Sequence, residues 1–310
     1  MSYEGFLQVA LAKGVGNVTL KKIIVFLQEQ SLSWNDLCCD DSLLNYVFNY
    51  KESIVQAIKN QGEHAKRISE KLHKKNIGII YYQDPQYPKK LKKSLGEKCP
   101  AFLFYKGNID LLNKKSVGFC GSRKASSKGL SITANCAQQL AKRDIVVVSG
   151  YAAGTDIAAH KSALQHSGGT IFVLAEGILR LSIKNEIKDF LTEKNHLFLS
   201  QYMPELTWNV GNAMKRNSVI IGLSSAMILV ESGKSGGTFA AGNETLAMGR
   251  PLFVIDFAQH EVSAEANPYF IERGGIPIRG KSGIPYLARV FSAIEDRNTI
   301  KELSHLILSN

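Results

Sequence analysis

The stretch Val117-Gly-Phe-Cys-Gly-Ser-Arg-Lys-Ala-Ser126 carries the strongest structural signal in this sequence. Its apolar first half is typical of a buried strand, and a helical pattern follows Gly129. A strand that ends at Gly-Ser beside a helix start leaves backbone N–H groups free to meet an anion. Arg123 adds a planar, permanently charged guanidinium. The stretch therefore predicts a phosphate-binding turn, although it also fits an ordinary strand-to-helix turn.

Short apolar runs alternate with helical stretches from residue 116 onward. Strands that are apolar throughout are typical of a parallel sheet covered on both faces. We therefore expect an α/β fold with a Rossmann-like, mostly parallel sheet and helices on both faces. Such sheets bind ligands beyond the carboxyl ends of their strands, near the point where the strand order reverses. The predicted strands span residues 116–120, 145–149, 170–174, 197–200, 226–230 and 251–255, and the predicted helices span residues 127–142, 155–166, 186–194, 213–224 and 238–249.

The beginning of the chain forms a separate segment in this interpretation. Apolar residues at helical spacing predict a small helical N-terminal domain over residues 1–75, of the helix-hairpin-helix or SAM-like type. The turn Gly14-Val15-Gly16-Asn17 resembles the hairpin of helix-hairpin-helix modules, whose amides can meet a DNA phosphate, and it also fits a plain helix connection. We place the boundary near residue 76, so that residues 76–310 form the Rossmann-like domain.

The chain carries a formal net charge of +11 over 310 residues. An excess of cations favours polyanionic partners, chiefly nucleic acid, because neutralised phosphates release their counterions. One predicted helix, over residues 52–75, is rich in cations, although such a charge run is also typical of a solvated face. Its cations are Lys59, Lys66, Arg67, Lys71, Lys74 and Lys75.

Composition and spacing disfavour several classes of protein. No apolar run reaches the length of about 18 residues that a membrane helix needs, and the first residues lack the pattern of a secretory signal. Five cysteines without Cys-x-x-Cys spacing indicate neither a zinc site nor a disulfide framework. We therefore expect a cytoplasmic protein with no metal site and no membrane partner.

The second predicted strand ends in the glycine-containing loop Ser149–Asp156. Gly150 allows a tight turn there, and Thr155 or Asp156 is placed to cap the following helix. His160 lies about one turn further along that helix. Asp156 and His160 fit either a capped helix with a satisfied core histidine or a catalytic pair, although no serine or cysteine nucleophile stands beside them.

Two later segments repeat the pattern of small or basic residues near a helix start. They are Lys215-Arg216-Asn217 and Glu231-Ser-Gly-Lys-Ser-Gly-Gly-Thr238. The second contains Gly-Lys-Ser, but Ile228 stands where a P-loop has its first glycine, so we exclude a P-loop NTPase. The Gly-x-Gly-x-x-Gly pattern of dinucleotide sites is absent at the first turn, so we expect no cofactor.

Taken in order, these segments resemble the DNA-processing protein A (DprA/Smf) family. The family pattern Gly-Ser-Arg-x-x-Ser matches residues 121–126, and Ser-Gly-x-Ala-x-Gly-x-Asp-x-x-Ala-His-x-x-Ala-Leu matches residues 149–164. A basic Arg-Asn motif before an Ile-rich helix matches residues 215–224. With an upstream Tyr-Pro-x-x-Leu at residues 87–91, the resemblance covers the chain from about residue 80 to about residue 260.

The resemblance implies a protein without catalysis, whose residues 76–310 bind DNA. Such a protein binds and protects single-stranded DNA and assists the loading of a RecA-type recombinase in natural transformation or recombination, and it acts as a homodimer. Tyr151, Tyr202 and Trp208 are candidates for base stacking, or are simply core or rim residues. Carried over position by position, the DNA-binding residues are Gly121, Ser122, Arg123, Ser126, Gly150, Lys184, Asn185, Lys215, Arg216 and Asn217.

The chain also departs from the family pattern. Ala153 and Ser218 stand where the family has basic residues, and each loss is expected to weaken phosphate binding by about 1–3 kcal/mol. A competing interpretation is a Rossmann-like nucleotide-binding sensor or nucleotide-cleaving enzyme. Phosphoribohydrolases carry Pro-Gly-Gly-x-Gly-Thr-x-x-Glu, but Ala241 replaces that glutamate here, which argues against base–ribose cleavage. A scaffold whose basic helical domain binds protein is a third alternative.

Overall fold

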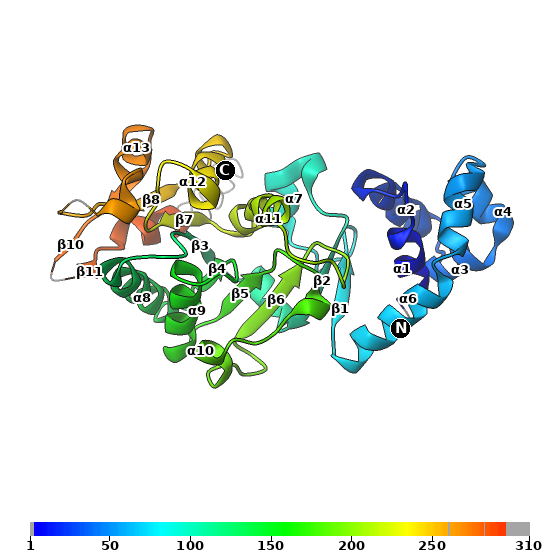
Figure 1. Cartoon of the computed structure of the whole chain (residues 1–310), viewed down its shortest axis with the longest axis horizontal. Helices are drawn as coiled ribbons and strands as arrows, with labels where there is room; N and C mark the ends of the chain where they lie inside the picture. The colour runs from blue at the N-terminus through cyan, green and yellow to red at the C-terminus, as the bar shows by residue number, and fades with distance from the viewer. Residues whose placement is uncertain (1–2, 260, 282, 296–310) are drawn as a thin grey trace, which may run out of the picture.

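A nine-stranded sheet organises the chain from Gly78 onward, and a group of helices precedes it in the sequence (Figure 1). The structure is a computed structural model that describes residues 3–259, 261–281 and 283–295. The end of the predicted second domain, residues 296–310, lies outside the described residues.

The strand order of the main sheet is β1-β2-β6-β5-β4-β3-β7-β8-β9. Neighbours from β6 to β9 are parallel, whereas β2 pairs antiparallel with both β6 and β1. The predicted mostly parallel sheet is therefore confirmed, with an antiparallel pair at one edge. The strands are β1 (Gly78–Tyr81), β2 (Phe102–Gly107), β3 (Ser116–Cys120), β4 (Val146–Ser149), β5 (Thr170–Val173), β6 (His196–Ser200), β7 (Ala226–Leu229), β8 (Leu252–Ile255) and β9 (Ile276–Ile278), and a separate two-stranded ladder joins β10 (Gly280–Lys281) to β11 (Ile284–Pro285).

Alternate side chains of the central strands enter cores on opposite faces of the sheet. In β4, Val146 and Val148 belong to one core and Val147 to the other, as the two-residue period of a strand requires. Both faces are apolar because both are covered, which is why the strands read as continuous apolar runs.

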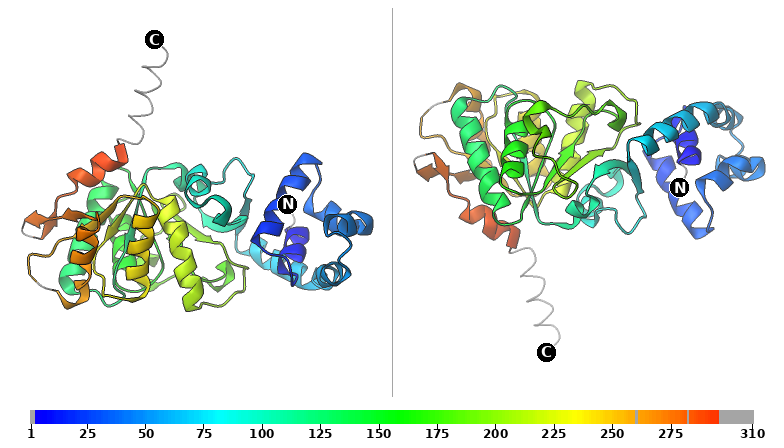
Figure 2. Two further views of the ribbon diagram at one scale, coloured as in Figure 1. Left: turned by 90° about the horizontal axis from the view of Figure 1, so that it is seen from above. Right: turned by 90° about the horizontal axis from the view of Figure 1, so that it is seen from below.

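Helices cover both faces, as predicted. Residues of α7, α11, α12 and α13 pack in one core, and residues of α8 and α9 in the other. The left view of Figure 2 has α11 and α12 in front of the sheet, and the right view has α8 and α9 in front. No helix of the described residues is both long and apolar enough to cross a membrane. These helices are α7 (Lys89–Leu95), α8 (Ser127–Ala141), α9 (Thr155–Gln165), α10 (Asn185–Lys188), α11 (Val210–Leu223), α12 (Gly236–Ala247) and α13 (Asn267–Glu272), with 3₁₀ turns η1 (Gly96–Lys98), η2 (Ile109–Asn113), η3 (Ile178–Arg180) and η4 (Val262–Ala264).

The segment before the sheet is helical, as expected. However, the predicted single helix over residues 52–75 is wrong, because α5 ends at Lys59 and α6 begins at Gly62. Asparagine and glycine are weak helix formers, and Asn60 lies in the break while Gly62 is the first residue after it. The helices are α1 (Glu4–Leu11), α2 (Asn17–Glu29), α3 (Trp34–Cys39), α4 (Asp41–Val47), α5 (Glu52–Lys59) and α6 (Gly62–Lys74).

The helix predicted over residues 186–194 is also shorter than expected, since α10 ends at Lys188. The Asn195 side chain explains the difference. Its Oδ1 accepts from Thr192 N at 2.8 Å and its Nδ2 donates to the Phe190 carbonyl oxygen at 2.8 Å. An asparagine that bonds nearby backbone offers the chain a turn in place of a helix.

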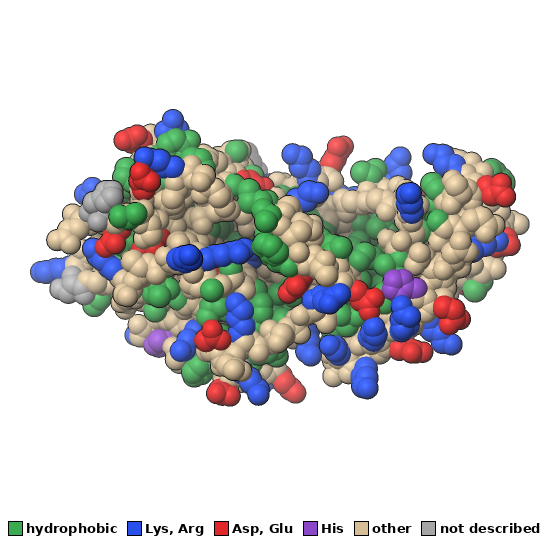
Figure 3. All heavy atoms as spheres, in the orientation of Figure 1, with side chains coloured by type: hydrophobic (Ala, Val, Ile, Leu, Met, Phe, Trp, Pro, Cys, Tyr) green, Lys and Arg blue, Asp and Glu red, His purple; other side chains and the backbone are tan. Residues whose placement is uncertain are grey.

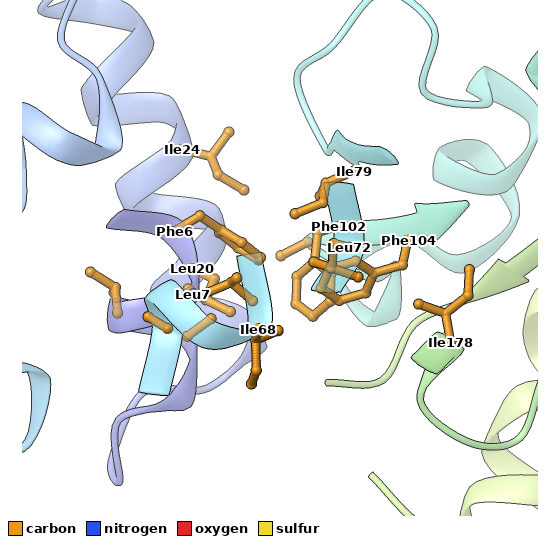
Figure 4. Packing of buried hydrophobic residues seen from close by; sticks show 14 of the residues in the cluster. Phe6, Leu7, Leu20, Ile24, Ile68, Leu72, Ile79, Phe102, Phe104 and Ile178 are labelled. Carbon is orange, nitrogen blue, oxygen red and sulfur yellow. The ribbon is translucent and has the colours of Figure 1, made fainter. Parts of the chain in front are cut away.

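The N-terminal helices share one apolar core with the edge of the sheet. Phe6 of α1 and Leu72 of α6 are fully buried, and they pack in the same cluster as Phe102 and Phe104 of β2 (Figure 4). The Phe6 ring meets the rings of Trp34, Tyr81 and Phe102 edge-on, with centroids 5.0–5.2 Å apart. The division into two domains near residue 76 stays a prediction.

The turn predicted as a hairpin contact is held against the start of β2. Asn17 Nδ2 donates to the Cys99 carbonyl oxygen at 3.0 Å, and Asn17 Oδ1 accepts from Ala101 N at 2.7 Å. Lys21 Nζ donates to the Glu97 carbonyl oxygen at 2.8 Å. These bonds give the turn a structural role at the junction, and a DNA contact there stays a prediction.

We expect Phe6→Ala to lower the free energy of unfolding by about 3–5 kcal/mol, because a buried phenylalanine leaves a cavity when it is truncated. Chemical denaturation followed by circular dichroism measures the loss. Val18→Ala is the control, since Val18 is 64% exposed and its truncation should change stability by less than about 0.5 kcal/mol. A loss below about 1 kcal/mol for Phe6→Ala would contradict a shared core.

Candidate nucleic-acid interface

A cavity of about 420 Å³ opens at the carboxyl ends of β3, β4 and β7. The strand order reverses there, since β4 pairs with one edge of β3 and β7 with the other. Loops that leave a sheet on either side of such a point diverge and form a crevice. Most of the predicted site residues line the cavity, namely Gly121, Ser122, Arg123, Gly150, Arg216 and Asn217.

The loops after β3, β4 and β7 are bonded to one another around the cavity. Thr155 N donates to the Ser122 carbonyl oxygen at 3.2 Å, and Thr238 Oγ1 donates to the Gly121 carbonyl oxygen at 2.9 Å. A Cβ on Gly121 would lie 2.3 Å from Thr155 Oγ1, so this approach requires glycine. The three loops therefore form one connected rim.

The start of α8 already holds an anion, which was not predicted from the sequence. Glu231, fully buried at the end of β7, accepts from Ser126 N at 2.9 Å and from Ser126 Oγ at 2.5 Å. Ser126 Oγ also accepts from Gly129 N at 3.0 Å and caps the helix. The site that a helix start offers to a phosphate is thus filled by a carboxylate of the chain itself.

The start of α12 is arranged differently. Its N-cap, Ser235, makes no side-chain capping bond, and Gly236 has φ +88°, a conformation that favours glycine. Gly237 and Thr238 of its first turn line the cavity. The partial positive charge of this helix start therefore faces the cavity.

Arg123 is exposed at the rim. Its guanidinium carbon lies 5.4 Å from the centre of the Trp208 ring, within the range of a cation–π contact. Trp208 is 44% exposed, and Val210 and Met214 beside it are also exposed. The mouth of the cavity thus presents a cation and an apolar edge side by side.

Arg216 lies inside the cavity wall and is only 7% exposed. Its Nη1 donates to the Val173 carbonyl oxygen at 2.8 Å, while its Nε is buried without a hydrogen-bond partner among the described residues. None of the ion pairs between described residues includes it. Burial lowers the pKa of this guanidinium, and the charge of Asp156 partly offsets that effect.

Gly150 provides the space that Arg216 occupies. A Cβ at Gly150 would lie 1.9 Å from Arg216 Nη1 and 2.5 Å from Asp156 Oδ2. Asp156 itself accepts from Ser149 Oγ at 2.8 Å and from Ala152 N at 3.2 Å, so it fixes the loop after β4. The prediction that Thr155 or Asp156 caps α9 is wrong, because the N-cap is Gly154, which has φ +76° and no side chain to cap with.

Lys184 and Asn185 do not line the cavity. Lys184 Nζ donates to the Tyr151 carbonyl oxygen at 2.9 Å and lies 4.7 Å from the centre of the Tyr151 ring. Burial lowers the pKa of Lys184, and the nearby charge of Arg123 acts in the same direction. Asn185 is exposed at the start of α10.

Consecutive residues of the basic motif on α11 point in different directions, because successive side chains of a helix are turned by about 100°. Arg216 faces inward, while Lys215 is exposed and does not line the cavity. Asn217 lines the cavity, and its Nδ2 donates to the Gly237 carbonyl oxygen at 3.4 Å. Of this motif, the structure brings Arg216 and Asn217 to the site and leaves Lys215 outside.

The hypothesis of a catalytic Asp156–His160 pair is wrong. His160 is fully buried, and its Nε2–H donates to the Gly150 carbonyl oxygen at 2.7 Å. Because that carbonyl can only accept, Nε2 carries a proton, and burial lowers the pKa of His160 to about 3, so the ring is neutral and Nδ1 is unprotonated. Nδ1 therefore accepts the single hydroxyl proton of Thr170, whose Oγ1 lies 2.5 Å from Nδ1 and 3.1 Å from the Val147 carbonyl oxygen. His160 therefore holds the Gly150 turn from the buried side, and both of its ring nitrogens are engaged in hydrogen bonds, so neither is free for proton transfer.

Sequence reasoning missed two roles at this site. Glu231 follows an apolar run, and a carboxylate at the end of a buried strand is a signal that it has a partner. Ser218, which stands where the family has a basic residue, instead donates to Glu244 Oε1 of α12 at 2.5 Å. That bond ties Glu244 to α11. Among the described residues no group of His, Cys, Asp and Glu is placed to hold a metal ion.

We expect His160 to make folding sensitive to mild acid. Burial lowers the pKa of His160 from 6.5 to about 3, so stability is full above pH 6.5 and falls as the pH drops from there toward 3. Between pH 7.5 and pH 5.5 this one group should remove about 1.4 kcal/mol of unfolding free energy. Urea titrations at both pH values measure it, with His160→Gln as the comparison. Equal pH dependence in the two proteins would show that His160 does not titrate this way.

Comparison with known proteins places this geometry in a family. A sequence profile described as DNA recombination-mediator protein A matches residues 78–283. The DNA processing protein DprA of Bacillus subtilis is 27% identical over 249 residues, which are 78% of this chain and 81% of that protein. DprA of Streptococcus pneumoniae is 35% identical over 159 residues, or 51% of this chain and 56% of that protein.

Solved structures agree with this assignment. The X-ray structure of DprA from Streptococcus pneumoniae has a TM-score of 0.72 at 25% identity, covering 92% of this chain and 96% of the other. A structure of DNA processing protein A from Helicobacter pylori, described by its single-stranded DNA binding mode, has a TM-score of 0.57 at 23% identity, covering 73% of this chain and 96% of the other, and supports the fold alone. With a profile match over most of its length, this chain belongs to the DNA recombination-mediator protein A family, the DprA/Smf family.

Proposed function

We propose that the cavity at the ends of β3, β4 and β7 binds the phosphate backbone of single-stranded DNA. The observation that carries this proposal is Arg216, a buried guanidinium that lines the cavity with an unpartnered Nε. A buried charge that is not held in an ion pair is costly, and the nearby charge of Asp156 offsets that cost only in part. A phosphate supplies the missing charge and accepts from guanidinium N–H groups. The uncapped start of α12 adds a second attraction for the same anion.

The rim fits a single strand better than a duplex in this proposal. Trp208 presents an exposed ring on which an unpaired base can stack, and bases within a duplex are not available for such stacking. The other two candidates have their hydroxyls engaged: Tyr151 donates to the Ser182 carbonyl oxygen at 3.1 Å, and Tyr202 to that of Asn212 at 2.6 Å. These contacts support Trp208 as the stacking residue.

The biological role that we propose follows the family. Its members are known as recombination mediators, and the Helicobacter pylori relative is described as binding single-stranded DNA. We propose that this chain protects single-stranded DNA and assists the loading of a RecA-type recombinase in the cytoplasm, as a homodimer and without catalysis. The engagement of Asp156 and His160 in holding the β4 loop supports the last point.

We expect Arg216→Met to separate DNA binding from stability. Losing hydrogen bonds from a charged group should weaken binding of an oligothymidylate by about 10- to 100-fold. The free energy of unfolding should stay within about 1 kcal/mol of the wild-type value or rise, because a buried unpaired charge is replaced by an apolar side chain of similar length. Fluorescence anisotropy and urea denaturation measure the two. A destabilised variant that keeps its affinity would make Arg216 a structural residue and remove the basis of the proposal.

We expect Arg123→Glu to abolish most binding in the same assay, since it replaces a phosphate contact by a repelling charge at the mouth of the cavity. Lys124→Glu is the matched control, because Lys124 is the next residue, is exposed and does not line the cavity. Equal losses in the two variants would mean that net charge, rather than this site, determines affinity. Competition by duplex DNA and by a nucleoside monophosphate tests the preference for a single strand.

A further inference from the structure

Four of the five lysine and arginine residues of helix α6 and its C-cap lie along one side, beside the loop that leads to the cavity, whereas Lys66 does not. Arg67, Lys71 and Lys75 are spaced four residues apart, and Lys74 lies next to this row, so all four share one face. All four are exposed; Glu63 and Glu70 are also exposed and, lying four residues before Arg67 and Lys74, they border the same face. Figure 3 shows lysine and arginine side chains gathered over α6 in the lower right of the view. We call Arg67, Lys71, Lys74 and Lys75 the α6 basic face.

This face is connected to the rim of the cavity through Glu205. Lys71 Nζ lies 2.6 Å from Glu205 Oε1, and His64 Nε2 lies 3.3 Å from Glu205 Oε2. Glu205 belongs to the loop between β6 and α11, which reaches Trp208 at the mouth of the cavity three residues later. The α6 basic face is thus fixed next to the segment that carries the proposed stacking residue.

Further cations lie between the face and the cavity. Arg180 Nε donates to the Glu205 carbonyl oxygen at 3.1 Å, which places an exposed guanidinium beside the same loop. Lys184 is close enough to Glu186, Asp156 and Arg123 for all three charges to act on it, and the last two of these residues line the cavity. Cations therefore lie near both the cavity and the Glu205 loop, together with the carboxylates of Glu186 and Glu205.

We propose that the α6 basic face is a second contact for the same single strand that enters the cavity, so that the helical segment extends the DNA path. This inference rests on the proposed function of the cavity. A flexible single strand follows a run of cations through its phosphates, without needing the shape of a duplex. The α6 basic face lies next to the loop that reaches the cavity, so one single strand can contact both. An acidic protein surface would explain the face but not its position beside the cavity.

The test compares short and long oligonucleotides on the whole chain. The α6 variant carries Arg67→Glu, Lys74→Glu and Lys75→Glu, and keeps Lys71 because its ion pair holds the Glu205 loop. The control variant carries Lys22→Glu, Lys93→Glu and Lys98→Glu, which are exposed and change the net charge equally. Figure 1 has α2 and α7, which hold the first two control residues, at the upper edge of the molecule and α6 at the lower edge.

Binding is measured by anisotropy with oligothymidylates of about 6 and about 25 nucleotides, the short one able to fill only the cavity. For the α6 variant we expect about a 10-fold or greater loss of affinity for the long oligonucleotide and less than about a 2-fold change for the short one. The slope of log affinity against log salt for the long oligonucleotide should fall by about 2, since each lost phosphate contact on a single strand removes about 0.7. The control variant should match the wild type.

Three results would overturn the inference. They are wild-type affinity of the α6 variant for the long oligonucleotide, an equal loss in the control variant, and competition by polyglutamate as strong as competition by the oligonucleotide, which would assign the face to an acidic protein. Failure of the wild type to bind the short oligonucleotide has a different meaning. It would contradict the proposed function of the cavity and, with it, the extension along α6.

Discussion

A buried positive charge without a paired carboxylate is the constraint on which the arrangement of the site depends. Arg216 occupies space that exists only because Gly150 has no side chain, and the Gly150 turn is in turn held by His160 from within the core. Asp156 lies close enough to moderate the charge but is engaged in fixing its own loop. Arg216 therefore has no ion-pair partner among the described residues, which favours the binding of an anion from outside.

Two helix starts near the cavity have opposite roles. At α8 the chain supplies its own anion, Glu231, which ties the end of β7 to the loop after β3. At α12 no side chain caps the helix, and the first turn lines the cavity. At the start of α8, the carboxylate of Glu231 occupies the place where a phosphate could otherwise bind. The attraction for a ligand is therefore concentrated between the start of α12, Arg216 and Arg123.

The sheet was predictable because its signal is local. Val146, Val147 and Val148 are apolar in a row, and such a row fits a strand with two covered faces. Features that depend on contacts between distant parts of the chain could not be predicted in this way. The capping of α9, the partner of Glu231 and the break before Gly62 follow from tertiary contacts or from small differences in helix propensity. Six of the ten residues that the family resemblance indicates line the cavity, and only the structure shows that Arg216 lies in its wall while Lys215 is exposed outside it.

The pairing of β3 with β7 has a consequence for how the protein is made. Val117 pairs with Ala226, 109 residues later in the chain, so the two sides of the cavity come from segments that a ribosome releases far apart in time. Contacts of such high sequence separation form slowly, because a long loop must close before they are gained. A nascent chain that has emerged only through β6 carries Arg123 but neither Arg216 nor Glu231. The unfinished protein therefore lacks the buried cation and the carboxylate that complete the site, and it acquires them together when the second half of the sheet joins the first.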